Sequence, residues 1–137
     1  MAVVLDTGVA LSAADVDEPR HGDCAELLRA HHGGLLMPAP AVAETAWMIE
    51  SRLGPAGETA FLGLITAGEL KVVDLSLDDY RRCVELIDTY ADMGLGLVDA
   101  SVITIAERLG IDTLATLNRR DFAVVRPRHL DAFTLLP

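Results

Sequence analysis

Four residues that are far apart in the sequence have the side chains and the positions to assemble a site for a divalent cation. They are Asp6, Glu44, Asp99 and Asn118, and each falls near the end of a predicted strand or the start of a predicted helix. Carboxylate oxygens are hard ligands, and a set of them without cysteine or histidine favours Mg²⁺ or Mn²⁺ over zinc. An ion held in this way orients or deprotonates a water and neutralises phosphate charge. These residues therefore indicate metal-assisted hydrolysis of a phosphodiester.

Asp6 is the most informative of the four because it directly ends the first apolar run of the chain. Residues 2–5 read Ala-Val-Val-Leu, which is typical of a buried strand, and Thr7-Gly8 turns the chain at once. In an open parallel sheet, ligands bind just beyond the carboxyl ends of the strands. We therefore expect Asp6 at the edge of a sheet where such sites form.

The remaining elements alternate in a way that predicts one layered domain over residues 1–137. Strands are expected at about 2–6, 35–37, 70–75, 113–117 and 133–136, and helices at about 7–14, 20–32, 40–53, 57–67, 76–91 and 98–109. Strands separated by helices indicate right-handed crossovers and a parallel sheet with helices on both faces. The predicted fold is a three-layer α/β/α sandwich around a parallel sheet of about five strands.

The same positions also have purely structural interpretations. Asp6 and Asp99 stand where an acid caps a helix and is favoured by the helix dipole. Glu44 fits a solvated helix face or a salt bridge, although its neighbours in residues 41–47 are mostly small and apolar. Taken singly, each residue leaves the structural and the functional interpretation open.

Composition and charge restrict the class of protein. Hydrophobic residues make up 51% of the chain, no run approaches the length of a membrane span, and no basic segment precedes the first apolar stretch. Cys24 and Cys83 are isolated thiols without metal-ligand spacing, so we expect them to be reduced in a cytoplasmic protein.

The net charge of −10 argues against loose, nonspecific binding of nucleic acid. It is compatible with a cluster of carboxylates that binds a divalent cation, or with a basic protein partner that neutralises the surface. The basic residues are uneven, since Arg119, Arg120, Arg126, Arg128 and His129 crowd into one short stretch near the carboxyl end.

Six short motifs, in a fixed order, extend over nearly the whole chain. They are Val3-Val4-Leu5-Asp6-Thr7, Pro40-Ala41-Val42-Ala43-Glu44, Tyr90-Ala91-Asp92, Gly96-Leu97-Val98-Asp99-Ala100-Ser101, Ala106-Glu107-Arg108-Leu109-Gly110 and Thr116-Leu117-Asn118-Arg119-Arg120-Asp121-Phe122. In order and spacing they resemble the PIN-domain ribonucleases, and most closely the VapC-type toxins of VapBC toxin–antitoxin pairs.

This resemblance implies a Mg²⁺-dependent endoribonuclease, with Mn²⁺ as a possible substitute, that cuts structured RNA such as tRNA or ribosomal RNA. It also implies a homodimer and a cognate VapB-type antitoxin. Asp6, Glu44 and Asp99 match the three core acidic positions of the family, which implies that they bind the metal. The fourth position is Asn118 here, where many relatives have Asp; an amide accepts a hydrogen bond but brings no charge.

Six further residues are candidates for supporting the site or contacting the substrate. Each also has a structural interpretation: a helix cap, a hydrogen bond within its own helix, a strand position or a solvated surface. They are Thr7, Asp92, Ser101, Thr116, Arg119 (with its neighbour Arg120) and Asp121. Asp121 either compensates for the missing charge of Asn118 or is a surface acid before the core residue Phe122. Trp47 and Phe61 are expected in the core or in a dimer interface.

Two other functions compete with the nuclease hypothesis. A phosphotransfer domain of the receiver type needs an acidic pair after the first strand and a late lysine, but the only lysine, Lys71, is badly placed. The haloacid dehalogenase type needs Asp-x-Asp, and Gly8 takes the third place of that motif. A catalytically weak or inactive PIN-like module that binds RNA or protein is favoured by Asn118 and disfavoured by the three intact acids.

In the nuclease hypothesis, an arginine of the antitoxin would displace the metal from Asp6, Glu44 and Asp99.

Overall fold

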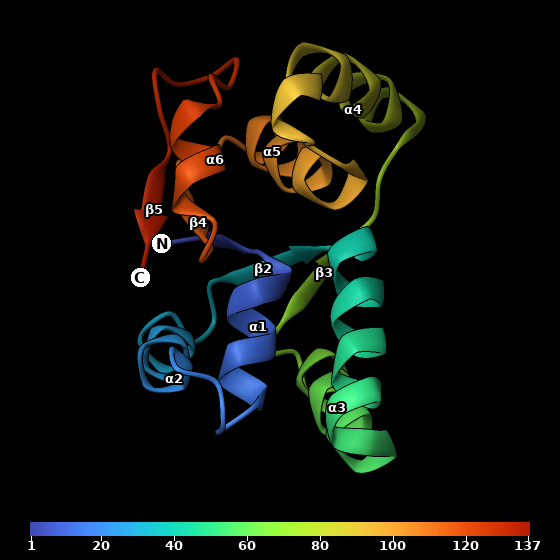
Figure 1. The fold of residues 1–137 in the computed structure, drawn as a ribbon, viewed down its shortest axis with the longest axis vertical. Coiled ribbons are helices and arrows are strands. Elements are labelled where there is room, and N and C mark those ends of the chain that lie inside the picture. The colour runs from blue at the N-terminus through green and yellow to red at the C-terminus, as the bar shows by residue number, and fades with distance from the viewer.

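Five parallel strands form the middle layer of the structure, a computed structural model that describes residues 1–137 (Figure 1). The strands are β1 Val3–Leu5, β2 Leu35–Pro38, β3 Lys71–Val73, β4 Thr113–Ala115 and β5 Thr134–Leu136. Their order across the sheet is β3-β2-β1-β4-β5, and every neighbouring pair is parallel. The predicted sheet is confirmed, although four of its strands are shorter than expected.

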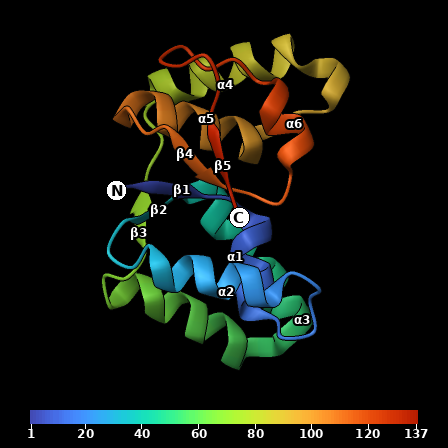
Figure 2. The ribbon, with the colours of Figure 1, turned by 90° about the vertical axis from the view of Figure 1, so that its left-hand side faces the viewer.

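The helices cover both faces of the sheet. They are α1 Thr7–Ala14, α2 His21–Ala30, α3 Ala39–Thr66, α4 Leu77–Thr89, the 3-10 helix η1 Ala91–Met93, α5 Leu97–Leu109 and α6 Arg119–Val124. Figure 2 shows α1, α2 and α3 on one side of the strands and α4, α5 and α6 on the other. The predicted three-layer sandwich is therefore confirmed. No helix combines the length and hydropathy that a membrane-spanning segment needs.

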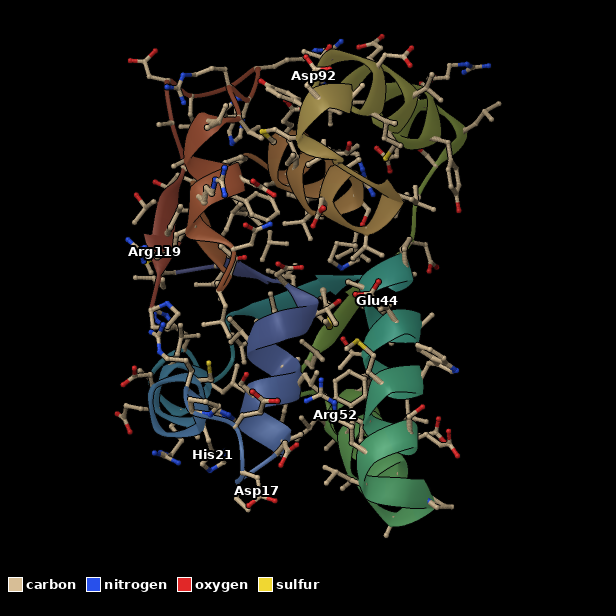
Figure 3. All side chains as sticks on the ribbon, viewed as in Figure 1. Asp17, His21, Glu44, Arg52, Asp92 and Arg119 are labelled. Atoms are coloured by element: carbon tan, nitrogen blue, oxygen red, sulfur yellow. The ribbon has the colours of Figure 1, made fainter.

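Helix α3 is broken where the sequence predicts a break. Gly54 has φ 73° and ψ −172°, which are not helical, and Pro55 follows it. A positive φ suits glycine because it has no Cβ. The helix resumes at once, so the two expected helices are joined directly, without a loop. The first part of α3 carries Glu44 close to the sheet (Figure 3).

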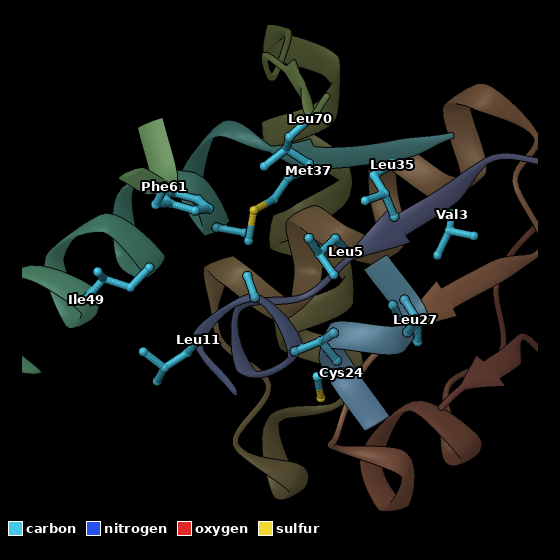
Figure 4. Close-up of a cluster of buried hydrophobic side chains, with 14 residues drawn as sticks. Val3, Leu5, Leu11, Cys24, Leu27, Leu35, Met37, Ile49, Phe61 and Leu70 are labelled. Carbon is cyan, nitrogen blue, oxygen red and sulfur yellow. The ribbon is translucent and has the colours of Figure 1, made fainter. Parts of the chain in front are cut away.

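Two apolar clusters, one on each face of the sheet, hold the layers together. Side chains alternate along a strand, so Val3 and Leu5 of β1 belong to one cluster while Val4 belongs to the other. Figure 4 shows the first cluster, which lies against α1, α2 and α3. Burial on both faces explains why the strands read as continuous apolar runs.

Two predictions about individual side chains have different outcomes. Phe61 is buried in the core, as expected, but Trp47 is 69% exposed, so it does not lie in the core, and its other expected place, a dimer interface, stays a prediction. The two cysteines are buried and unpaired, which agrees with the expected free thiols.

Helix α6 and the short 3-10 helix η1 have no counterpart among the predicted elements. The segment after β4 was expected to continue as a strand to residue 117, whereas β4 ends at Ala115 and α6 begins at Arg119. Asn118 caps the new helix, since its side chain accepts a hydrogen bond from the Asp121 backbone. With six residues, α6 is too short to show a helical period of apolar residues.

Helix α4 is tied to α5 by a largely buried ion pair. The guanidinium of Arg82 donates to both oxygens of Glu107, at 2.8 and 2.9 Å, and the backbone N–H of Arg128 donates to Glu107 at 2.7 Å. The side chains of Arg82 and Glu107 are only 15% and 8% exposed. Burial alone would raise the pKa of Glu107, but these hydrogen bonds outweigh it and hold the pKa below its usual value.

We predict that Glu107→Gln lowers the free energy of unfolding at pH 7 by about 3 kcal/mol, because Arg82 loses a buried partner. A lowered pKa means that the carboxylate stabilises the fold above pH 4.5 and loses this effect as the pH falls through the folded-state pKa. The difference between the two proteins, measured by urea unfolding, should therefore shrink below about pH 4.

Glu85→Gln is the matched control, because Glu85 pairs with Arg82 and Arg128 but is 54% exposed. It should cost less than about 1 kcal/mol. Equal losses in the two variants would contradict a special role for the buried pair.

Candidate functional site

Strand β1 lies in the middle of the sheet, where the direction in which successive strands are added reverses. From β1 the chain adds β2 and β3 on one side and later β4 and β5 on the other. In sheets of this kind, ligands bind beyond the carboxyl ends of the strands at that point. Asp6 follows β1 and Thr116 follows β4, so both lie at this edge.

Asp6 is buried and fixed by two hydrogen bonds. One carboxylate oxygen accepts from the Thr7 backbone N–H at 2.8 Å, so Asp6 caps α1. The other accepts from the Thr116 hydroxyl at 2.8 Å. That hydroxyl accepts from the Asn118 backbone N–H at 3.0 Å, which leaves its own proton for Asp6. The capping interpretation is therefore correct, and the second oxygen of Asp6 is oriented from β4.

Glu44 and Asp99 reach the same edge from two helices that contact each other, α3 and α5. Glu44 lies in the second turn of α3 and is exposed, while Thr45 beside it is buried and donates to the Ala41 carbonyl at 2.7 Å. Asp99 lies half-buried in the first turn of α5 and accepts a hydrogen bond from the Gly96 backbone.

Asn118 and Asp121 form a side-chain pair at the start of α6. The Asn118 amide donates to the Asp121 carboxylate at 3.0 Å, in addition to capping the helix. This pair was not foreseen, although an N-cap residue followed three positions later by an acid is a recognisable signal for a helix start. We call Asp6, Glu44, Asp99 and Asp121 together the acidic edge.

The carboxylates of the acidic edge repel one another. Burial raises the pKa of Asp99 to about 6, and the negative charge of Asp6 adds to this rise. The hydrogen bond from Gly96 opposes the rise, while the charges of Asp121 and Glu44 add to it. Asp99 therefore lies within electrostatic reach of the other three acids.

Burial also raises the pKa of Asp6, against the hydrogen bonds from Thr116 and Thr7, and the charge of Glu44 adds to the rise. None of the four acids of the acidic edge forms a salt bridge with an arginine, lysine or histidine. Buried charge without a partner is costly, so this edge is a favourable place for a cation.

The donor set fits a hard cation, but the ligands are not gathered into a tight group. No three histidine, cysteine, aspartate or glutamate side chains converge closely enough to hold an ion between them. Mg²⁺ keeps several waters and usually takes only one or two carboxylates directly. An acidic edge made of oxygen donors alone therefore suits Mg²⁺ or Mn²⁺ with part of its water shell retained.

Several predicted site residues have structural contacts instead. Arg119 donates to the carbonyls of Leu135, at 3.1 Å, and of Pro137, so it fastens the end of β5 and points outward (Figure 3). Asp92 is exposed in η1, and Figure 3 shows it well away from Glu44. The structure brings neither residue to the acidic edge.

The hydroxyls of Ser101 and Thr7, near two helix starts, also lie against backbone carbonyls. Ser101 is buried and donates to the Val98 carbonyl of its own helix at 2.7 Å. The hydroxyl of Thr7 faces the Ala41 carbonyl at 3.5 Å and does not cap α1, so the expected capping role of Thr7 is wrong. Of the hydroxyl groups of Thr7, Ser101 and Thr116, only that of Thr116 donates to an acid of the edge.

Comparisons with known proteins agree with this fold. The PIN domain family matches residues 3–126. Ribonuclease VapC26 of Mycobacterium tuberculosis is 27% identical over 135 residues, which cover 98% of this chain and 100% of that protein.

Two solved structures share the fold. The first is VapC20 of Mycobacterium tuberculosis, described as a sarcin–ricin loop cleaving toxin, with a TM-score of 0.77, 17% identity, and 82% and 87% of the two chains covered. The second is a toxin–antitoxin complex from Klebsiella pneumoniae, with a TM-score of 0.70, 19% identity, and coverage of 90% and 92%.

The raised pKa of Asp99 predicts that Asp99→Asn stabilises the metal-free protein. Because the folded-state pKa of about 6 exceeds the usual 3.8, the ionised side chain costs stability above pH 6, and the cost fades as the pH falls towards 4. In urea unfolding with EDTA, the variant should gain about 1 to 2 kcal/mol at pH 7.5 and nothing near pH 4. The gain is smaller than the full pKa shift corresponds to, because water screens the half-buried carboxylate.

Asp131→Asn removes the same charge from an exposed residue that precedes β5, at the opposite edge of the sheet. It should leave stability unchanged at both pH values. If Asp99→Asn gave a gain independent of pH, burial of the ionised carboxylate would not be its cause.

Proposed function

This chain belongs to the PIN domain family, and from that premise we propose that it is a metal-dependent endoribonuclease toxin neutralised by a cognate antitoxin. The observation that carries the proposal is the acidic edge, where the charges of Asp6 and Glu44 add to the raised pKa of Asp99 and no salt bridge offsets them. This edge lies beside β1, the strand at which the order of the sheet reverses. The similarity to a protein named as a ribonuclease over almost the whole chain supports the same activity.

In the proposed mechanism, Asp6, Asp99 and Glu44 hold Mg²⁺ or Mn²⁺. When bound, the ion orients and acidifies a water and neutralises charge on the scissile phosphate. Asp6 keeps one orientation because Thr7 and Thr116 donate to its two oxygens. Glu44 is the most exposed of the three acids and is the one best placed to accept a proton from the attacking water.

Asp121 supplies the fourth negative charge of the site in this proposal. Its carboxylate acts on Asp99 through space, and Asn118 holds it by a hydrogen bond of 3.0 Å. Asn118 therefore positions an acid instead of being one.

We predict that Asp121→Asn weakens Mn²⁺ binding about tenfold, because a charge beside the ion is lost. The cap of α6 survives, since it uses the Asp121 backbone N–H. Calorimetric titration of antitoxin-free protein with Mn²⁺ measures the effect. The exchange Asn118→Asp with Asp121→Asn should restore much of the affinity, whereas Asp131→Asn should not change it. Unchanged binding by Asp121→Asn would leave the fourth position without an acid.

The proposed substrate is structured RNA, either tRNA or ribosomal RNA. One structural relative is described as cleaving the sarcin–ricin loop, which supports an RNA of this class. We further propose a homodimer, for which the exposed Trp47 on α3 is a candidate contact residue.

The proposed antitoxin carries a basic segment. A chain with a net charge of −10 attracts such a segment electrostatically, and an arginine placed at the acidic edge takes the position of the cation. An apolar pocket of about 400 Å³ between α1, α2 and the second part of α3 offers a site for an apolar side chain of the partner. One structural relative is a toxin–antitoxin complex, which supports a partner of this kind.

The alternative is a PIN-like module that binds RNA or protein without cutting it. Asn118 favours it, because the side chain at this position adds no charge. The intact, mutually coupled Asp6, Glu44 and Asp99 favour the enzyme.

Cleavage of total tRNA and ribosomal RNA by purified, antitoxin-free protein tests the function. We expect cutting with Mg²⁺ or Mn²⁺, none with EDTA, and a loss of at least about 100-fold in Asp99→Asn. Added antitoxin should abolish the cutting. A folded protein that cuts neither RNA with either metal would favour the binding module.

A further inference from the structure

Nearly all lysine and arginine side chains of this protein already form a salt bridge or a hydrogen bond within the protein. Of the 11 lysine and arginine residues, seven arginines form salt bridges with acids. They are Arg20, Arg29, Arg52, Arg81, Arg82, Arg108 and Arg128. Arg119 and Arg126 donate to backbone carbonyls instead. Only Arg120 and Lys71 form neither a salt bridge nor a side-chain hydrogen bond, and both are exposed.

The two free cations lie at opposite edges of the sheet. Lys71 is the first residue of β3, so it lies at the amino ends of the parallel strands. Arg120 lies in the first turn of α6, between Asn118 and Asp121, beside the carboxyl ends. Arg120 is therefore the one cation at the acidic edge whose guanidinium has no partner.

We propose that Arg120 binds a phosphate of the RNA backbone and so positions the substrate at the acidic edge. This inference rests on the proposed ribonuclease function and names a residue that holds its substrate. Arg120 thus takes the substrate-contacting role that was expected of Arg119, whose guanidinium donates to carbonyls at the end of β5 instead.

The charge of the molecule makes such a contact necessary. RNA approaches a protein with a net charge of −10 at the edge where four carboxylates gather, so phosphate is repelled until cations offset that charge. A metal ion neutralises part of it. A guanidinium beside the ion adds a bidentate contact that fits the geometry of a phosphate.

Because the guanidinium of Arg120 has no partner within the protein, its binding to a phosphate costs less free energy. An arginine in a salt bridge gives up its carboxylate before it contacts phosphate, whereas Arg120 exchanges only water. Its backbone is held in place by the Asn118 cap and by Phe122, which is 1% exposed. Replacing the exposed side chain therefore leaves the fold and the acids of the edge intact.

Binding of RNA by protein that carries Asp99→Asn, which prevents cutting, tests this inference. The probes are immobilised bulk tRNA and ribosomal RNA, in Mg²⁺, over a series of KCl concentrations. Arg120→Gln should raise the Kd about three- to tenfold. It should also flatten the slope of log affinity against log salt by about 0.7 to 0.9, the value for one lost phosphate contact.

Two variants serve as matched comparisons. Lys71→Gln removes the same charge from the opposite edge and should change neither the Kd nor the slope. Arg120→Lys keeps the charge but not the bidentate fork, so it should keep the slope and recover only part of the affinity.

The outcomes separate this inference from the function on which it rests. If the wild-type protein cuts RNA while Arg120→Gln binds it as Lys71→Gln does, Arg120 is not a phosphate contact and the nuclease function stands. If the wild-type protein neither cuts nor binds either RNA, the proposed function fails and the inference fails with it.

Discussion

Burying the carboxylate of Asp6 beside other carboxylates costs free energy, and much of the architecture offsets that cost. The acid is only 7% exposed, yet no basic side chain faces it. Its stabilisation comes from the Thr7 backbone and from Thr116, one supplied by α1 and the other by the end of β4. The parallel pairing of β1 with β4 is what brings these donors together. The central strand pair thus fixes the orientation of the acid.

The other acids arrive on helices that belong to different layers. Glu44 comes from α3 on one face of the sheet, whereas Asp99 and Asp121 come from α5 and α6 on the other. An edge built from both faces depends on the packing of the whole domain. The repulsion among these acids lowers the free energy of unfolding, and contacts elsewhere in the domain offset this loss. One of them is the largely buried ion pair of Arg82 and Glu107 between α4 and α5.

Strong, repeated signals made most of the fold predictable from the sequence. Apolar runs predicted the strands, and the helix expected from residue 76 is α4, whose start has a capping box at Ser76. The gap expected between residues 53 and 57 matches the break in α3 at Gly54 and Pro55. The positions of Asp6 and Asp99 were predictable because an acid directly after a buried strand, or in the first turn of a buried helix, has a definite place in a parallel sheet.

Contacts that join distant segments were not predictable in the same way. The hydrogen bonds of Arg119 to the end of β5 depend on where the last strand pairs, and the exposure of Trp47 depends on which face of α3 meets the core. Helix α6 was missed because it is short and lacks an apolar period, although Asn118 and Asp121 have the spacing of a cap. The local pattern of residues does not predict which distant segments come into contact, nor a helix too short to show a period.

The missing counter-charge at the acidic edge has a consequence for the lifetime of the protein. A ligand that binds only the folded state stabilises it by mass action. An ion, or a cationic segment of a partner, relieves the repulsion around Asp6 and Asp99 and thereby lowers the population of open, protease-sensitive forms. The resistance of the protein to unfolding and the occupancy of its acidic edge are therefore coupled.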